Sequence, residues 1–196
     1  MTAEAAEQDA GAGVRLFLAL DLPAETGLLL EGWASSVLRD RARARILPAA
    51  ALHVTALFIG QRDTAEVPSI AGRAARIASL ARTPRLTAVS VDAVPPRRPR
   101  LLAIGLRDED GHAAELHSRL TAALAHPGVE RAEGRPYWPH VTLARLRGHG
   151  FLTPPREQPP PLEPFEPPAL TLYRSEPGPD GSRYTPLAST GFNRGA

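Results

Sequence analysis

The tripeptide His-Val-Thr occurs twice in this chain, at residues 53–55 and again at residues 140–142. Both copies lie in apolar, β-branched runs bounded by Pro or Gly, a pattern typical of buried strands. Successive side chains of a strand alternate between its two faces, so the His and the Thr of each copy point the same way. The repeat therefore favours a fold in which two strands present a His and a Thr to one ligand.

The rest of the pattern predicts strands and helices in a loosely repeated order. Gly60 is expected to end the first His strand, and Thr64 to cap the helix that follows. We expect a disordered N-terminal tail over residues 1–13 and a single bilobal domain over residues 14–196. The predicted strands cover residues 15–20, 45–60, 85–92, 100–106 and 138–146, the helices 23–38, 64–81 and 110–125, and a hairpin surrounds residues 178–182. Each half contributes one His strand, which predicts an α+β fold with a pseudo-twofold duplication.

The composition excludes several kinds of chemistry. The chain has no cysteine, so disulfides, thiolate metal sites and cysteine nucleophiles are absent. All 23 basic residues are arginine and the net charge is only +2, so charge alone is weak evidence for nucleic-acid binding. Guanidinium groups nevertheless suit phosphate wherever they cluster. Because no apolar run approaches the roughly 20 residues that cross a bilayer, and no hydrophobic signal segment is present, we expect a cytoplasmic protein.

The paired His and Thr residues suit chemistry at phosphorus. Displacement there prefers an attacking and a leaving oxygen in line, and a single imidazole cannot serve both sides. His53 and His140 could, because a pKa near about 6.5 lets one ring be neutral and the other protonated. Thr55 and Thr142 would donate hydrogen bonds to the non-bridging oxygens. No His-x-His or HExxH pattern occurs, so no metal site is expected.

Further residues are candidate RNA contacts. Trp138 shares a face with His140 and would either stack on a base or pack in the core. Arg145 would face away from His140 in a regular strand and would reach a phosphate only if a bulge intervenes. The alternating arginines of residues 39–45 either face phosphates or form a charged helix end. A Pro-rich turn holds three more candidates, Arg97, Arg98 and Arg100.

Five blocks of the sequence occur in the order found in one known family. They are RLFLALDLP at 15–23, LHVTALFIG at 52–60, PPRRPR at 95–100, PHVTLAR at 139–145, and LTLYRS at 170–175 followed by YTPL at 184–187. The chain resembles the RNA 2′,3′-cyclic phosphodiesterases, also called 2′-5′ RNA ligases, of the 2H phosphoesterase superfamily. The resemblance covers nearly the whole chain after residue 13. It implies two antiparallel sheets flanked by helices, with the active site in the cleft between them.

The resemblance also implies an activity. A 2′,3′-cyclic phosphate at an RNA end would be hydrolysed to a 2′-phosphomonoester, with His53 as the acid that protonates the 3′ oxygen and His140 as the base that activates water. No metal or other cofactor is implied, and the reverse reaction would join RNA ends through a 2′-5′ bond without ATP. We expect RNA or a small cyclic phosphate as the partner, no protein partner, no membrane association and a monomer.

Some positions differ from the usual family pattern where RNA would be held. Leu57 replaces a basic residue, Ala50 and Ala51 replace a Glu-Asn pair, and Ala103 replaces a Trp. Losing an aromatic and a cation weakens the grip on a single strand. Two alternatives therefore stay open: an RNA-end binding protein with weak or lost turnover, and a phosphodiesterase for small cyclic phosphates derived from nucleotides.

Overall fold

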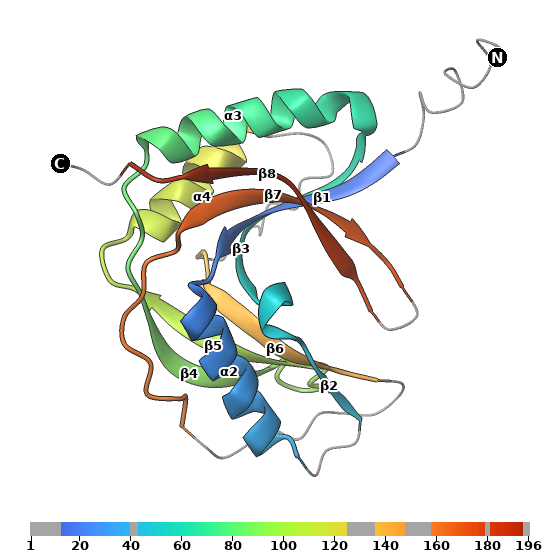
Figure 1. Cartoon of the computed structure of the whole chain (residues 1–196), viewed down its shortest axis with the longest axis vertical. Helices are drawn as coiled ribbons and strands as arrows, with labels where there is room; N and C mark the ends of the chain where they lie inside the picture. The colour runs from blue at the N-terminus through green and yellow to red at the C-terminus, as the bar shows by residue number, and fades with distance from the viewer. Residues whose placement is uncertain (1–12, 40–42, 125–135, 148–157, 179–180, 194–196) are drawn as a thin grey trace.

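The computed structural model describes residues 13–39, 43–124, 136–147, 158–178 and 181–193, and its helices and strands are arranged in two lobes (Figure 1). Its helices are α2 (Ala24–Val37), α3 (Val67–Leu80) and α4 (His112–Ala123), with the 3₁₀ turns η1 (Ala49–Ala51) and η2 (Thr64–Glu66). Its strands are β1 (Gly13–Asp21), β2 (Ala44–Ile46), β3 (His53–Asp63), β4 (Leu86–Val94), β5 (Leu101–Asp108), β6 (His140–Leu146), β7 (Ala169–Glu176) and β8 (Arg183–Gly191). None of the described helices is long and apolar enough to span a membrane.

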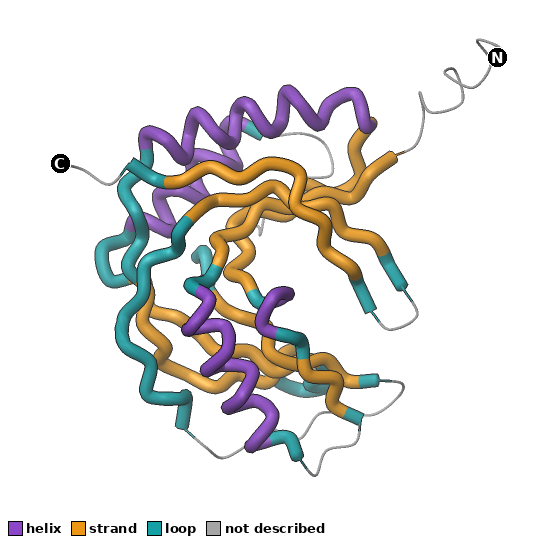
Figure 2. The backbone as a smooth tube through the Cα atoms, in the orientation of Figure 1, coloured by secondary structure: helices purple, strands orange, loops and turns teal. Residues whose placement is uncertain are grey.

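The strands form one antiparallel sheet in the order β4-β5-β6-β3-β1-β7-β8, with β2 paired to β6. The two sheets expected from the sequence are thus two parts of a single sheet. Their joint is narrow, because the His strands β3 and β6 pair only at Val54 and Val141. A register shift follows this pair on each strand, and bulges of this kind bend and twist a strand. The two parts therefore diverge on either side of the joint (Figure 2).

Each half of the chain sends its helix to the other part of the sheet. Helix α2 follows β1 in sequence but packs against β2 and β6, whereas α4 follows β5 and packs against β3 and α3. Helix α3 covers β7 and β8. One hydrophobic cluster, rich in Leu and Ala, continues from one lobe to the other. The reciprocal crossing supports the predicted duplication, although the twofold relation itself stays a prediction.

Most predicted helices and strands are confirmed to within a few residues, with three local corrections. Residues 45–60 do not form one strand, because β2 ends at Ile46 and the η1 turn separates it from β3, which begins at His53. Gly60 does not end its strand. It has a φ of 83° within β3, which continues to Asp63, and glycine permits this conformation at a bulge. Thr64 is not the helix cap, because the Asp63 carboxylate accepts from the Ala65 N–H at 2.8 Å, and Glu66 accepts from the Asp63 N–H at 3.3 Å. The predicted tail, apart from residue 13, lies outside the described residues.

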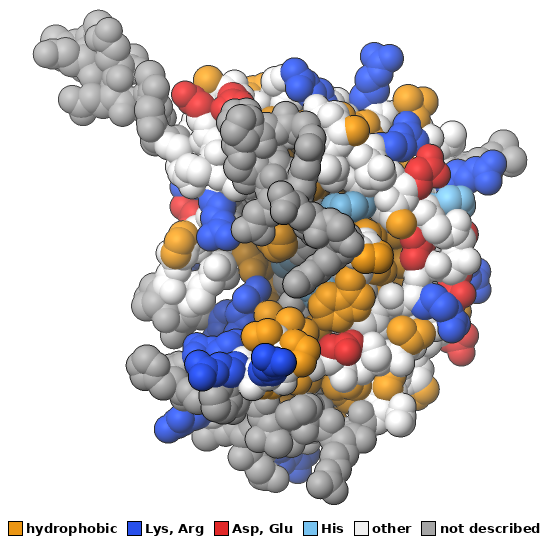
Figure 3. All heavy atoms as spheres, turned by 180° about the vertical axis from the view of Figure 1, so that it is seen from behind, with side chains coloured by type: hydrophobic (Ala, Val, Ile, Leu, Met, Phe, Trp, Pro, Cys, Tyr) orange, Lys and Arg blue, Asp and Glu red, His pale blue; other side chains and the backbone are white. Residues whose placement is uncertain are grey.

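Charge is unevenly distributed over the surface. Seen from behind, basic and acidic side chains are intermixed on one side of the molecule, while arginines gather toward the lower left (Figure 3). The lower left of this view is the side on which β2 lies in Figure 1. A chain with a net charge of only +2 can thus present a locally basic surface.

Candidate active site

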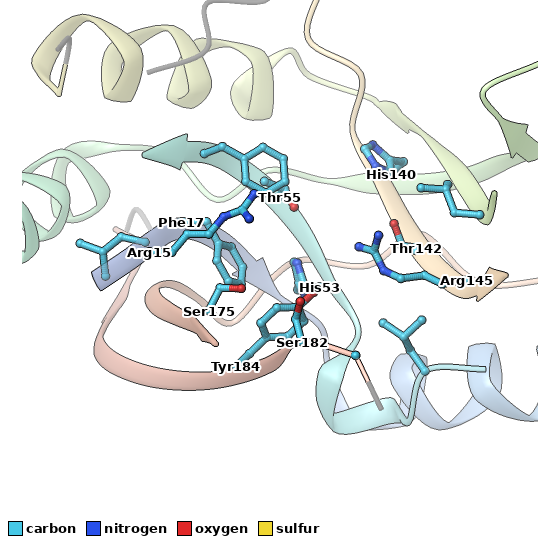
Figure 4. A pocket seen from close by; sticks show the side chains of 15 residues that line it. Arg15, Phe17, His53, Thr55, His140, Thr142, Arg145, Ser175, Ser182 and Tyr184 are labelled. Carbon is cyan, nitrogen blue, oxygen red and sulfur yellow. The ribbon is translucent and has the colours of Figure 1, made fainter. Parts of the chain in front are cut away.

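Both His strands face one hollow of about 450 Å³ between the lobes (Figure 4). His53 and Thr55 reach it from β3, and His140 and Thr142 reach it from β6. The structure therefore brings together the four residues that the duplicated tripeptide singled out. The rest of the lining comes mainly from β1 and from the β7–β8 hairpin.

The two imidazoles are anchored in the same way. The Nδ1 atom of His53 lies 2.9 Å from the carbonyl oxygen of Ala51, and that of His140 lies 2.9 Å from the carbonyl oxygen of Trp138. A carbonyl oxygen can only accept, so each Nδ1 carries a proton and donates it. Neither Nε2 atom makes a hydrogen bond with the described residues. Each ring can therefore take up or release a proton through Nε2.

The aromatic surroundings of the two rings differ. The His53 ring lies 5.0 Å from that of Phe17 and 5.2 Å from that of Tyr184, which meets it edge-on at 88°. The His140 ring stacks on Trp138 at 4.1 Å and 15°. Trp138 is 40% exposed, so it is not a core residue as one interpretation of the sequence proposed. Its present partner is His140, and base stacking stays a prediction.

Burial lowers the pKa of His53, because the charged imidazolium loses its hydration. Its hydrogen bond to the Ala51 carbonyl acts in the opposite direction, while the positive charge of Arg145 lowers the pKa further. The Asp21 carboxylate raises it, and His140 lowers it slightly. At a given pH, His53 is therefore neutral to a greater extent than an ordinary histidine.

Asp21 is held in a fixed position near His53. The two residues are directly opposite each other on the paired strands β1 and β3. The Asp21 carboxylate accepts hydrogen bonds from Thr171 at 2.6 Å and from Tyr173 at 2.8 Å. Burial, together with this carboxylate, raises the pKa of Tyr173, which keeps its hydroxyl protonated as a donor. The negative charge beside His53 is thus immobilised by the neighbouring strand.

A bulge in β6 directs Arg145 into the hollow. Ala103 lies opposite Thr142, but Leu102 lies opposite Ala144, so Leu143 is an extra residue. Leu143 and Ala144 are both buried. The alternation restarts after them, and Arg145 lines the hollow with Thr142. The sequence predicted that Arg145 could share a face with His140 only if a bulge lay between them, and the structure has that bulge.

Strand β3 has the same irregularity after its own His-Val-Thr. Ala56 and Leu57 are both buried, and Phe58 then returns to the hollow with half of its surface exposed. The two His strands thus place a third side chain at equivalent positions, Phe58 on one and Arg145 on the other. The hollow gains an apolar wall on the β3 side and a cation on the β6 side.

Two ring side chains support β3 where its pairing with β6 ends. The Tyr137 hydroxyl donates to the Thr55 carbonyl at 2.9 Å, and the His117 Nδ1 lies 2.7 Å from the Ala56 carbonyl. The Tyr137 and His117 rings stack at 4.6 Å and 13°. Burial raises the pKa of Tyr137, so its hydroxyl remains a donor. The backbone next to Thr55 is therefore fixed from outside the sheet.

The arginines of the β4–β5 turn lie away from the hollow. Arg97, Arg98 and Arg100 are exposed and do not line it. The Arg100 carbonyl accepts from the Leu146 N–H at 2.7 Å, which ties the turn to the end of β6. Contact between these arginines and a longer RNA strand stays a prediction. Among the described residues, no group of three or more His, Asp or Glu side chains could hold a metal ion.

Several residues that line the hollow were not predicted from the sequence. Arg15 and Phe17 belong to β1, and strand alternation puts them on one face with Asp21, a signal that the sequence did contain. Ser182 and Tyr184 reach the hollow because β7 pairs with β1 and β8 follows β7. No local pattern reports such a pairing between distant segments.

A family model and a known protein match most of this chain. A model of the 2′-5′ RNA ligase superfamily matches residues 30–174. The RNA 2′,3′-cyclic phosphodiesterase of Escherichia coli (strain K12) is 31% identical over 173 residues, which cover 88% of this chain and 93% of that protein.

Solved structures show the same fold. TT0787 of Thermus thermophilus superposes with a TM-score of 0.76 and 27% identity, covering 91% of this chain and 97% of that one. E. coli LigT in its apo form gives a TM-score of 0.73 and 26% identity, covering 93% and 99%. LigT complexed with 3′-AMP gives the same TM-score and identity, covering 93% and 100%. The chain belongs to the 2′-5′ RNA ligase superfamily.

Proposed function

We propose that this protein hydrolyses RNA 2′,3′-cyclic phosphodiester ends to 2′-phosphomonoesters, with His53 and His140 as its acid and base. One observation carries the proposal: two imidazoles, each tethered through Nδ1, line one hollow with a Thr hydroxyl beside each. The name of the E. coli relative supports the substrate class, and the LigT complex with 3′-AMP supports a nucleotide ligand for this fold.

The reaction needs one proton removed and one supplied. His140 Nε2 takes a proton from water as the water oxygen attacks phosphorus, and His53 Nε2 gives a proton to the 3′ oxygen as its bond to phosphorus breaks. The phosphate stays attached to the 2′ oxygen, and solvent restores the two protonation states. If a 5′-hydroxyl attacks phosphorus in place of water, the same acid and base act and the 3′ oxygen leaves as before, so a 2′-5′ bond forms without ATP.

The remaining polar lining residues stabilise negative charge. Thr55 and Thr142 donate to the non-bridging oxygens, since their hydroxyls make no hydrogen bond with any described residue. Arg15 and Arg145 line the same hollow and balance the phosphate charge. The protein groups that act on the phosphate therefore come from both lobes.

The role of His53 sets the sign of the pH dependence. An acid must be protonated, and burial lowers the pKa of His53 below its ordinary value of about 6.5. Activity of the free protein should therefore fall as pH rises through a value below about 6.5. The negative charge of a bound phosphate opposes the effect of burial on the pKa of His53. The alkaline fall in activity should therefore occur at a higher pH in kcat than in kcat/KM.

The test is turnover of a cyclic-ended oligonucleotide in excess EDTA, with separation of 2′- and 3′-phosphate products. We expect activity in the chelator, 2′-phosphate as the product, and losses of about 10²–10⁴ in His53→Ala and His140→Ala. His112→Ala, at the start of α4 and outside the hollow, is the matched control. Activity abolished by EDTA, or retained in both catalytic variants, would refute the proposal. Tight binding without turnover would instead indicate an RNA-end binding protein.

A further inference from the structure

We propose that Arg45 and Arg183 form a second phosphate site, which binds the phosphate on the 5′ oxygen of the reacting nucleotide. This inference rests on the proposed function and deepens it. It assigns the substrate as an RNA strand of two or more nucleotides, in which that phosphate is the link to the preceding nucleotide.

The site is a hollow of about 260 Å³ that adjoins the catalytic one. The two share Leu47, Ser182 and Tyr184 in their linings, so a strand leaving the catalytic hollow passes directly into the second. Arg45 and Arg183 supply the charge of the second hollow, and none of the described residues that line it is a carboxylate. The rest of the lining is short or apolar and consists of Pro48, Ala50 and Ala51. A lining with two guanidinium groups suits a phosphate.

The backbone pairing places a second cation beside Arg45. Arg45 on β2 lies directly opposite Arg145 on β6, so both side chains lie on one face of the sheet. Like charges in this position destabilise a sheet. Neither guanidinium makes an ion pair or hydrogen bond with the residues that the structure describes. Anions on this face relieve the repulsion, one in the catalytic hollow by Arg145 and one in the second hollow by Arg45.

The β7–β8 hairpin leaves space for the Arg45 guanidinium. Gly181 has a φ of 103°, and a Cβ atom there would overlap the Arg45 guanidinium. The φ favours glycine here, and the missing side chain leaves the guanidinium its present position. Arg45 therefore extends from β2 to the opposite hairpin, where Arg183 begins β8. The two cations come from different lobes and line one hollow, which adjoins the catalytic one.

The experiment compares substrates that share one cyclic end. They are a 2′,3′-cyclic mononucleotide, the same nucleotide with a 5′-phosphate, a dinucleotide with a normal phosphodiester, and a dinucleotide with an uncharged methylphosphonate link. In the unmodified protein we expect kcat/KM to be about tenfold higher for the phosphodiester than for the methylphosphonate dinucleotide, because one charge-assisted contact contributes on that scale.

Arg45→Gln and Arg183→Gln should each lower kcat/KM for the phosphodiester dinucleotide by about tenfold and change that for the cyclic mononucleotide less than about twofold. The slope of log kcat/KM against log salt should also become shallower by about 0.7 for each phosphate interaction that a variant removes. Arg76→Gln is the matched control, since Arg76 is exposed on α3, away from both hollows.

Equal losses on both substrates, or equal rates for the charged and uncharged links, would overturn the proposal. If a 5′-phosphorylated mononucleotide reacts as fast as the dinucleotide, a terminal phosphate suffices. The inference that the substrate is a strand of two or more nucleotides would then be wrong. If no substrate reacts at all, the proposed function fails but the site remains testable. Binding of a dinucleotide with a stable 3′-phosphate should then weaken about tenfold in Arg45→Gln, and unchanged binding would overturn the site.

Discussion

Replacing Thr142 with Val removes one hydroxyl from the catalytic hollow and leaves the shape of the side chain nearly unchanged. The hydroxyl makes no hydrogen bond with the described residues, so its removal breaks no bond among them. We therefore expect the free energy of unfolding to change by less than about 0.5 kcal/mol. The same holds for Thr55→Val on the other His strand.

The effect on catalysis should be much larger. If the hydroxyl donates to a phosphate oxygen whose charge grows in the transition state, its loss costs about 2.7–4 kcal/mol, or about 10²–10³ in kcat. KM should change little, because the interaction strengthens mainly in the transition state. Thr55 and Thr142 reach the hollow from different strands but would act on one phosphate, so the double variant should lose less activity than the product of the two single losses.

The assay is steady-state hydrolysis of a cyclic-ended dinucleotide, with denaturant unfolding of the same samples. Thr142→Ser and Thr55→Ser are the matched controls, since they keep the hydroxyl and lose a methyl group, and they should stay within about tenfold of the unmodified protein. Val variants that retain a third of the activity would refute the role of the hydroxyls. Val variants no slower than the Ser variants would do the same.

Three further results are expected. The pH profile of kcat/KM should fall on its alkaline side below about pH 6.5, because burial lowers the pKa of His53; a plateau extending to about pH 8 would contradict the acid role of His53. Gly105→Ala would place a Cβ 2.7 Å from Asp92 Oδ2 and 3.4 Å from Trp138 Nε1, so unfolding in denaturant should show a loss of about 1–3 kcal/mol. An unchanged midpoint would show that these neighbours yield freely. Tyr137→Phe removes the donor to the Thr55 carbonyl and should lower the free energy of unfolding by about 1–3 kcal/mol, whereas thermal and denaturant midpoints equal to those of the unmodified protein would show that another donor replaces it.

The periodicity of the sequence was sufficient to locate the helices and strands, because most of them have one buried and one exposed face. It was not sufficient to describe how the strands join. Whether two sheets are separate or continuous depends here on one residue pair, Val54 with Val141, and these valines look like any other buried strand residues. The error at Gly60 has a similar origin, since a glycine inside a bulged strand and a glycine after a strand look alike.

In the site, too, residues placed by local strand alternation were predictable, whereas residues placed by pairing between distant segments were not. The duplicated tripeptide identified His53 and His140 because strand alternation is a local rule. Arg145 required knowledge of a bulge, and the Leu-Ala pair before it is ordinary apolar sequence. Tyr184 and Arg45 reach the two hollows only through pairings between segments far apart in the chain, which no short window of sequence reports.

The reciprocal crossing of α2 and α4 makes the folding of each lobe depend on both halves of the chain. Each lobe obtains a covering helix from the half of the chain that supplies the other lobe's His strand. A cut in the segment between α3 and β4 would therefore yield two fragments that each lack the cover for their own strands. We expect such fragments to fold only when mixed, and the intact chain to unfold in a single transition. The sites of both histidines would then form and unfold in the same transition, and neither lobe would stay folded without the other.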